Sequence, residues 1–307
     1  MRDAFVDQLS ALAEKDPNLI LITGDLGFGI FDHFVERFPK QFINAGVAEQ
    51  NMTGLSAGLA LAGKTVFTYS IANFSTLRCL EQIRNDVAYH QLNLNIVASG
   101  GGFTYGALGM SHHATEDLAI MRALPGITVV APCSAWEAAE ATRVLPKMSG
   151  ASYLRLEKGG NPSPHFEACS FEIGRAIEVS PGRDITIICI GGILELAIKA
   201  AQSLSNNGYS ARVLAMHTLK PLDRKAVVDA VNETGKIITV EEHNIVGGLG
   251  SAVAEVIAEE GLQVDFVRLG LPDSYCSVVG DQMFLRTHFG LDDQAITNEA
   301  LALIRRK

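Results

Sequence analysis

Short runs of apolar residues, each about the length of a β-strand, alternate with helical periodicity along the first half of the chain. The runs predict strands over residues 19–23, 42–44, 65–69, 94–98, 128–131 and 152–156. The segments around them predict helices over residues 1–14, 31–38, 49–61, 75–89, 115–123 and 135–145. Strands and helices that alternate in this way are typical of a mostly parallel sheet covered by helices on both faces.

The alternation stops at residues 158–164, where glycine, asparagine and proline cluster. Such a cluster is typical of a loop, and we interpret it as a linker between two domains. A second set of strands follows, predicted over residues 185–190, 211–215, 236–241 and 265–269. We therefore predict two doubly wound, mostly parallel α/β domains, residues 1–165 and residues 166–307.

Composition narrows the function classes. The 307 residues are 48% hydrophobic and 19% charged, so each domain can bury a core. A net charge of −9 without a long basic run argues against nucleic acid as a partner, while a pocket for a small anion needs only a few local cations. The longest apolar stretches are too short to cross a membrane. Five scattered cysteines without a CxxC pair, and an N-terminus unlike a signal peptide, indicate a cytoplasmic protein.

A glutamate begins the helix after the second predicted strand. Residues 44–48 form a turn of small residues, and the helix that starts at Glu49 carries Gly54 and Gly58, which allow another element to pack closely. Glu49 is either a carboxylate with a chemical role or an ordinary first-turn glutamate favoured by the helix dipole.

Two adjacent histidines, His112 and His113, follow the glycine-rich residues 100–109 and precede a predicted helix. Loops at the carboxyl ends of strands hold the ligands of doubly wound sheets. The pair is a candidate for catalysis, for an ordinary surface position or for zinc, although no other Cys or His stands at zinc-ligand spacing. Residues 240–251 (VEEHNIVGGLGS) lack the GxGxxG spacing and are interpreted as a tight strand-to-helix turn.

In this order, the three segments resemble the transketolase family of thiamine enzymes, from about residue 20 to the C-terminus. The resemblance covers the pyrimidine-binding domain and the C-terminal domain. The family's diphosphate and metal motif, Gly-Asp-Gly followed later by Asn, is missing, because Leu26 follows Gly24-Asp25 and Gln282 follows Gly280-Asp281. The chain also begins shortly before the first strand of the pyrimidine-binding domain.

The resemblance therefore implies a partner, an N-terminal transketolase subunit that carries the diphosphate-binding domain. It implies thiamine diphosphate bound across the interface, with Mg²⁺ or Ca²⁺ held mainly by the partner. It also implies self-association, with two copies of each chain.

The same resemblance implies coenzyme contacts. Glu49 matches the catalytic glutamate that hydrogen-bonds the coenzyme's pyrimidine ring and promotes proton transfer. Phe74 matches an aromatic residue that stacks on this ring, and its alternative is an ordinary core position. Asp25 matches an acid near the thiazolium, or is a turn aspartate. Arg78 and Gln82, on the next helix, are candidates for further contacts.

The expected substrate contacts lie further along the chain. His112 matches the family histidine that moves a proton at a substrate oxygen, and His113 is expected to line the same channel. Arg155 matches an arginine that binds the substrate phosphate, with a salt bridge between the domains as the alternative. Leu108 and Gly100 stand where transketolases of ordinary sugar phosphates carry an acid and a histidine. Because the acid and the histidine are absent here, we expect the substrate to be a modified or deoxygenated sugar, or a shorter 2-oxo compound.

We expect a transferase that moves a two-carbon ketol unit from a ketose to an aldehyde. The alternatives are a beta-type subunit of a 2-oxo acid decarboxylase or dehydrogenase, a carboligase similar to deoxyxylulose phosphate synthase, and a non-catalytic α/β scaffold. The presence of both Glu49 and His112 argues against the scaffold.

Overall fold

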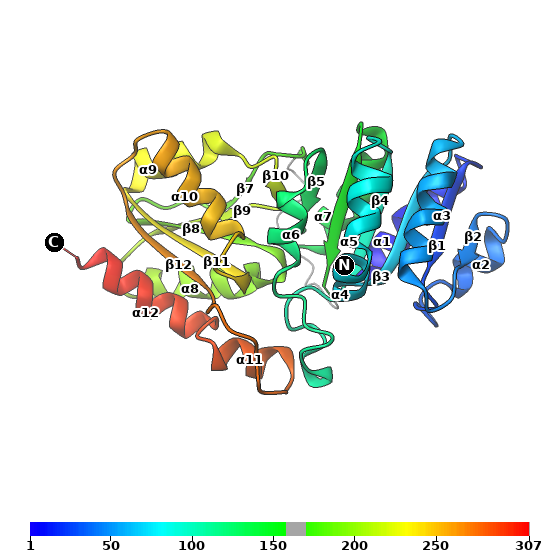
Figure 1. Ribbon diagram of the computed structural model, residues 1–307. Helices are drawn as coiled ribbons and strands as arrows, with labels where there is room; N and C mark the ends of the chain where they lie inside the picture. Colours follow the sequence, from blue (N-terminus) through cyan, green and yellow to red (C-terminus); the bar gives the residue numbers. More distant parts are fainter. Residues whose placement is uncertain (158–169, 307) are drawn as a thin grey trace.

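The computed structural model describes residues 1–157 and 170–306, which form two α/β units side by side (Figure 1). The predicted linker and the predicted boundary near residue 165 lie outside the described residues. The division into residues 1–165 and 166–307 therefore stays a prediction, while the two-sheet α/β architecture is confirmed.

The first sheet has seven strands in the order β10-β5-β6-β4-β3-β1-β2. The first half of the chain supplies six of these strands, all parallel: β1 (Leu19–Thr23), β2 (Phe42–Asn44), β3 (Thr65–Ile71), β4 (Leu94–Ser99), β5 (Ile127–Val130) and β6 (Ala151–Leu156). Every residue of β1, β4 and β6 is buried, as expected for strands covered on both faces.

Helices cover both faces of this sheet (Figure 1). They are α1 (Arg2–Ala13), α2 (Asp32–Arg37), α3 (Glu49–Leu61), α4 (Ala72–Thr76), α5 (Leu80–Gln82), α6 (Asp117–Ala123) and α7 (Ala135–Val144). Alternate residues of β1 point to opposite faces. Leu19 and Leu21 pack in the cluster of α1 and α7, whereas Ile20 and Ile22 pack in the cluster of α3 and α6.

One predicted helix is divided. A single helix was predicted over residues 75–89. In its place the structure has four short helical segments: the end of α4, a single turn at Leu77–Cys79, α5 and a π-helix at Ile83–Ala88. The hydroxyl of Thr76 donates to the carbonyl of Ala72 at 2.7 Å, a side-chain bond that competes with the helical ladder and bends helices. π-helical turns are common at functional sites.

The second sheet has five strands in the order β12-β11-β8-β9-β7. The four predicted strands are present and parallel: β8 (Ile185–Ile190), β9 (Ala211–Ala215), β11 (Lys236–Asn244) and β12 (Asp265–Leu271). An antiparallel edge strand, β7 (Ile177–Ser180), was not predicted. The helices are α8 (Leu194–Asn206), α9 (Arg224–Thr234), α10 (Leu249–Glu259), α11 (Gln282–His288) and α12 (Asp293–Ile304).

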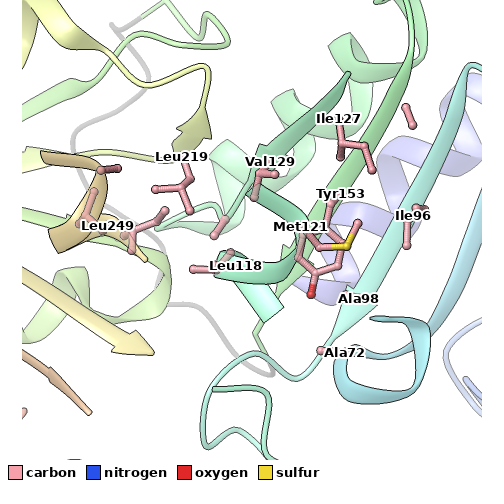
Figure 2. Close-up of a cluster of buried hydrophobic side chains, with 14 of the residues drawn as sticks. Ala72, Ile96, Ala98, Leu118, Met121, Ile127, Val129, Tyr153, Leu219 and Leu249 are labelled. Atoms are coloured by element: carbon pink, nitrogen blue, oxygen red, sulfur yellow. The ribbon is translucent and has the colours of Figure 1, made fainter. Parts of the chain in front are cut away.

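The two units share structure. Strand β10 (Thr218–Lys220) comes from the second half of the chain, yet it pairs antiparallel with β5 at the edge of the first sheet. Leu219 and Leu249 of the second half belong to the same buried cluster as Leu118 and Val129 of the first half (Figure 2). One hydrophobic core therefore runs through the junction and fixes how the units face each other.

Candidate active site

The predicted coenzyme residues follow the carboxyl ends of β1, β2 and β3, along one edge of the first sheet. Glu49 is the first residue of α3 and only 3% exposed. One carboxylate oxygen accepts a hydrogen bond from Nη1 of Arg78 at 3.0 Å, and the other from the hydroxyl of Ser70 at 3.4 Å. Glu49 is therefore a buried carboxylate held by two donors at a helix N-terminus, where the helix dipole favours a negative charge.

Phe74 and His112 complete this group. The guanidinium carbon of Arg78 lies 4.0 Å from the centroid of the Phe74 ring, in cation–π contact. The rings of His112 and Phe74 make a T-shaped contact, with the centroids 5.2 Å apart. Glu49, Arg78, Phe74 and His112 thus form one continuous cluster, although 63 residues separate its first and last members in the sequence.

The loop that carries His112 is tied down on this side. The side-chain amide of Asn73 donates to the carbonyl of Ser111 at 2.9 Å, and the hydroxyl of Ser111 lies 3.0 Å from Nδ1 of His112. Partial burial lowers the pKa of His112, and the neighbouring His113 and Arg78 lower it further. A neutral imidazole at this position can accept or donate a proton near neutral pH.

The side chain of His113 points away from Phe74 and contacts Gly106 and Phe103. This residue is 3% exposed, its Nε2 lies 3.2 Å from the carbonyl oxygen of Gly106, and its ring makes a T-shaped contact with Phe103. The structure thus places His113 inside the loop, where it supports the loop's shape, while His112 contacts Phe74.

Arg155 lies at the junction of the two units. Its side chain is 3% exposed, its Nε is 3.5 Å from Oδ2 of Asp117, and its Nη2 donates to the backbone carbonyl of Glu242 at 2.9 Å. Burial alone would lower the pKa of Arg155. The negative charges of Asp117 and the buried Glu157 have the larger effect, so the pKa of Arg155 is raised. The ion pair with Asp117 lies within the first unit, and the hydrogen bond to the carbonyl of Glu242 is the contact that reaches the second unit.

Asp25 and Gln82 occupy the margins of the cluster. Asp25 follows β1 in a left-handed conformation (φ 58°), and Asn44 holds it through reciprocal hydrogen bonds of 2.9 and 3.0 Å. Gln82 lies on α5 beside α3. Its buried side-chain oxygen has no partner among the residues that the structure describes.

Ser70, Asn73 and Asn44 were not singled out in the sequence. Each contacts a predicted site residue or its loop. Ser70 and Asn44 lie at the ends of strands, and Asn73 lies in α4, directly after β3. Their position at the carboxyl edge was the available signal.

Two further features concern residues 1–157 and 170–306 only. Among them, no three His, Cys, Asp or Glu side chains gather so that they could hold a metal ion. No helix in these ranges has the length and hydropathy that crossing a bilayer requires.

Two family models match the sequence: the transketolase pyrimidine-binding domain over residues 1–162, and the transketolase C-terminal domain over residues 174–296. The chain belongs to the transketolase family. This order of domains is the one predicted from the three motifs.

The chain is also similar to named transketolase subunits and to a solved structure. The chain is 38% identical over 308 residues to a subunit of the apulose-4-phosphate transketolase of Phocaeicola vulgatus, covering 99% of this chain and 97% of the relative. It is 35% identical to the 6-deoxy-6-sulfo-D-fructose transketolase subunit SqwH of Clostridium sp., covering 100% and 95%. A solved structure described as a split gene transketolase, inactive beta4 tetramer, superposes with a TM-score of 0.91 at 35% identity, covering 99% and 97%.

These likenesses confirm the predicted family, fold and enzyme class, a transketolase-type transferase of ketol units. The synthase alternative is the more remote one. A 1-deoxy-D-xylulose-5-phosphate synthase of Geobacter sulfurreducens is 34% identical, but this chain covers only 48% of it.

Proposed function

We propose that this chain is the C-terminal subunit of a split transketolase. With thiamine diphosphate and a separate N-terminal subunit, it transfers a two-carbon ketol unit from a ketose to an aldehyde. The observation that carries the proposal is the cluster of Glu49, Phe74 and His112 at the carboxyl edge of the first sheet.

The cluster fits the aminopyrimidine of the coenzyme. Glu49 offers a buried carboxylate that can accept a hydrogen bond from a ring nitrogen, and Phe74 offers an aromatic face. The unpartnered side-chain oxygen of Gln82 is an acceptor that an exocyclic amine would satisfy, and Asp25 and Arg78 are further proposed contacts. Thiamine diphosphate, when bound, supplies the nucleophilic carbon that attacks the ketose carbonyl.

The protein's own groups manage protons and orientation. Glu49 holds a proton at the pyrimidine ring through a charge-assisted hydrogen bond in a water-poor position. His112, with a lowered pKa, exchanges a proton with a substrate oxygen. His113 shapes the loop, and Arg155 joins the two units, so the substrate phosphate is not assigned to Arg155.

The proposed donor is a modified ketose. Leu108, 57% exposed in the turn before His112, stands where the family carries an acid for ordinary sugar phosphates. The relatives are named for apulose 4-phosphate and for 6-deoxy-6-sulfo-D-fructose, and the second name is that of a deoxygenated sugar. An apolar residue at position 108 suits a donor that lacks the hydroxyl an acid would bind.

The proposed assembly contains two copies of each chain. The relatives named as subunits, and the neighbour described as a split gene product in an inactive beta4 tetramer, support a partner and self-association. We assign the diphosphate and its Mg²⁺ or Ca²⁺ to the partner, because the Gly-Asp-Gly…Asn motif is missing from this sequence. The free thiols of Cys79, Cys133, Cys189 and Cys276 support a cytoplasmic location.

The test is a reconstitution of both chains with thiamine diphosphate and Mg²⁺, in which aldehyde release from ketose donors is measured. Glu49→Gln in this complex should lower kcat at least about a hundredfold, the scale of an acid–base group. The control is Glu259→Gln, an exposed carboxylate of α10 paired with Arg224. Near-normal turnover by the Glu49 variant would refute the assignment. Carbon dioxide release from a 2-oxo acid, without ketol transfer, would favour the decarboxylase alternative.

A further inference from the structure

Three buried residues in a row, Glu241, Glu242 and His243, belong to β11 at the junction of the two units. Successive residues of a strand point to opposite faces. The carboxylate of Glu241 stays within the second unit and accepts the backbone N–H groups of Leu249 and Gly250, at 2.7 and 2.8 Å, at the start of α10. The neighbouring carboxylate of Glu242 faces the first unit instead.

Glu242 is 2% exposed and binds a loop of the other unit. Its carboxylate accepts the backbone N–H of Phe103, which lies in the loop that leads from β4 to the His112 pair. The same carboxylate accepts bonds from two side chains of α11, the guanidinium of Arg286 and the amide of Gln282, the latter at 3.0 and 3.1 Å. One side chain therefore joins the second unit, α11 and the loop.

Glu157, at the end of the first unit, completes the group. Arg286 and Gln282 reach its carboxylate at 3.2 and 3.3 Å, and the backbone N–H of Gly192 donates to it at 2.8 Å. Burial, and then the neighbouring charge of Glu242, raise the pKa of Glu157. We call Glu157, Glu242, Gln282 and Arg286 the interdomain clasp.

The loop backbone rests directly on these side chains. A Cβ atom built on Gly102 would overlap the carboxylate of Glu242, and one built on Gly101 would overlap the guanidinium of Arg155. Gly102 also exchanges backbone hydrogen bonds with Ala114 on the far side of the loop, at 2.8 and 3.0 Å. Nη2 of Arg155 donates to the carbonyl of Ala114 at 3.4 Å, so both ends of the segment over residues 102–114 are held by groups beside the domain junction.

We propose that the interdomain clasp is a positioning device for the proposed ketol transfer. It fixes the backbone at Phe103, and through the loop it sets the position of His112 against Phe74. The second unit then contributes to the reaction through loop geometry, without touching substrate or coenzyme. The proposal rests on the proposed function only for its kinetic consequences.

The test compares neighbouring buried carboxylates. Glu242→Ala removes the acceptor of the Phe103 N–H, and Glu242→Gln keeps an acceptor there. The matched control is Glu241→Gln, which weakens the start of α10 but leaves the loop alone. In the reconstituted complex, Glu242→Ala should lower kcat about tenfold to a hundredfold, the scale of a small misplacement of a catalytic group. Glu242→Gln should recover most of this loss, and Glu241→Gln should stay within about twofold of wild type.

Hydrogen exchange provides a readout that does not depend on activity. In Glu242→Ala, the peptides over residues 100–113 should exchange at least about tenfold faster than in wild type, whereas Glu241→Gln should change only residues 247–252. If Glu242→Ala does not fold, Gln282→Ala loosens the same group more mildly and takes its place.

Unchanged exchange over residues 100–113 in the clasp variants, or a loss of kcat as large in Glu241→Gln, would overturn the proposal. A wild-type complex that lacks ketol transfer would instead count against the proposed function, and the exchange experiment would still decide whether the clasp holds the loop.

Discussion

Glu137 makes the stability of this chain depend on pH in an unusual direction. The residue lies in the first turn of α7 and is fully buried. Its carboxylate accepts the backbone N–H of Cys133, while its own N–H donates to the hydroxyl of Ser134 at 3.1 Å, an exchange similar to a capping box. Its other oxygen is buried without a partner within residues 1–157 and 170–306. Burial raises the pKa of Glu137 to about 8.

The direction of this pH dependence follows from the number of protons that Glu137 binds in the folded and the unfolded chain. In the unfolded chain this carboxyl ionises near its ordinary pKa of about 4.3, and in the folded chain it stays protonated up to about pH 8. Between these values the folded state binds more protons, so stability falls as pH rises, and the loss stops above the folded pKa. Each pH unit costs about 1.4 kcal/mol, so raising the pH from 5.5 to 7.5 costs about 3 kcal/mol through this group alone.

Urea unfolding of wild type and Glu137→Gln, followed by circular dichroism at pH 5.5, 6.5 and 7.5, isolates the effect. Glutamine cannot ionise, so the free energy of unfolding of the variant should gain about 3 kcal/mol relative to wild type over this range. The cost of burying an amide is the same at each pH and cancels. His217, whose pKa burial lowers to about 4, titrates equally in both proteins. Parallel pH curves for the two proteins would refute the reasoning.

Three further outcomes are expected. His112→Ala should lower kcat about a hundredfold to ten-thousandfold, while the affinity for thiamine diphosphate, measured by calorimetry, stays within about twofold; an equal loss of affinity would contradict a role in proton transfer. Leu108→Asp should raise kcat/KM for xylulose 5-phosphate relative to a deoxygenated donor about tenfold, and an unchanged ratio would remove position 108 from donor selection. Arg155→Met should lower the free energy of unfolding by about 3–5 kcal/mol in urea melts, because Asp117 stays buried without its cation; a loss below about 1 kcal/mol would count against the ion pair.

The fold was predictable where burial is complete. Strands β1 and β8 are buried throughout and apolar at all but one position each, a pattern that predicts strands covered on both faces of a sheet. β10 has three residues and pairs with β5, a strand about ninety positions away, so no local sequence pattern predicts it. The helix predicted over residues 75–89 is divided because serine and threonine bonds to the backbone compete with the helical ladder.

The candidate site was predictable by position but not by direction. Glu49, Phe74 and His112 all follow parallel strands, and the carboxyl ends of these strands meet at one edge, so their proximity follows from the topology. His112 and His113 are adjacent, yet only the contacts of the folded loop decide that one meets Phe74 and the other packs under Gly106. The direction of Arg155 depends on Asp117 and on a carbonyl of the second unit, partners that no local pattern identifies.

The charges of the cluster indicate how the two proposed subunits divide the reaction. Arg78 is paired with Glu49, and Arg155 with Asp117, so both arginines assigned to the site from sequence are neutralised by partners within the chain. A diphosphate group placed beside these pairs would add negative charge without gaining a free guanidinium, and the chain as a whole already carries −9. Proton transfer needs a different set: a buried carboxylate, an aromatic face and a histidine that is neutral near pH 7, all of which the cluster contains. Under the proposed function, this chain supplies the groups for proton transfer, and the proposed N-terminal subunit supplies the cations for the charged end of the coenzyme.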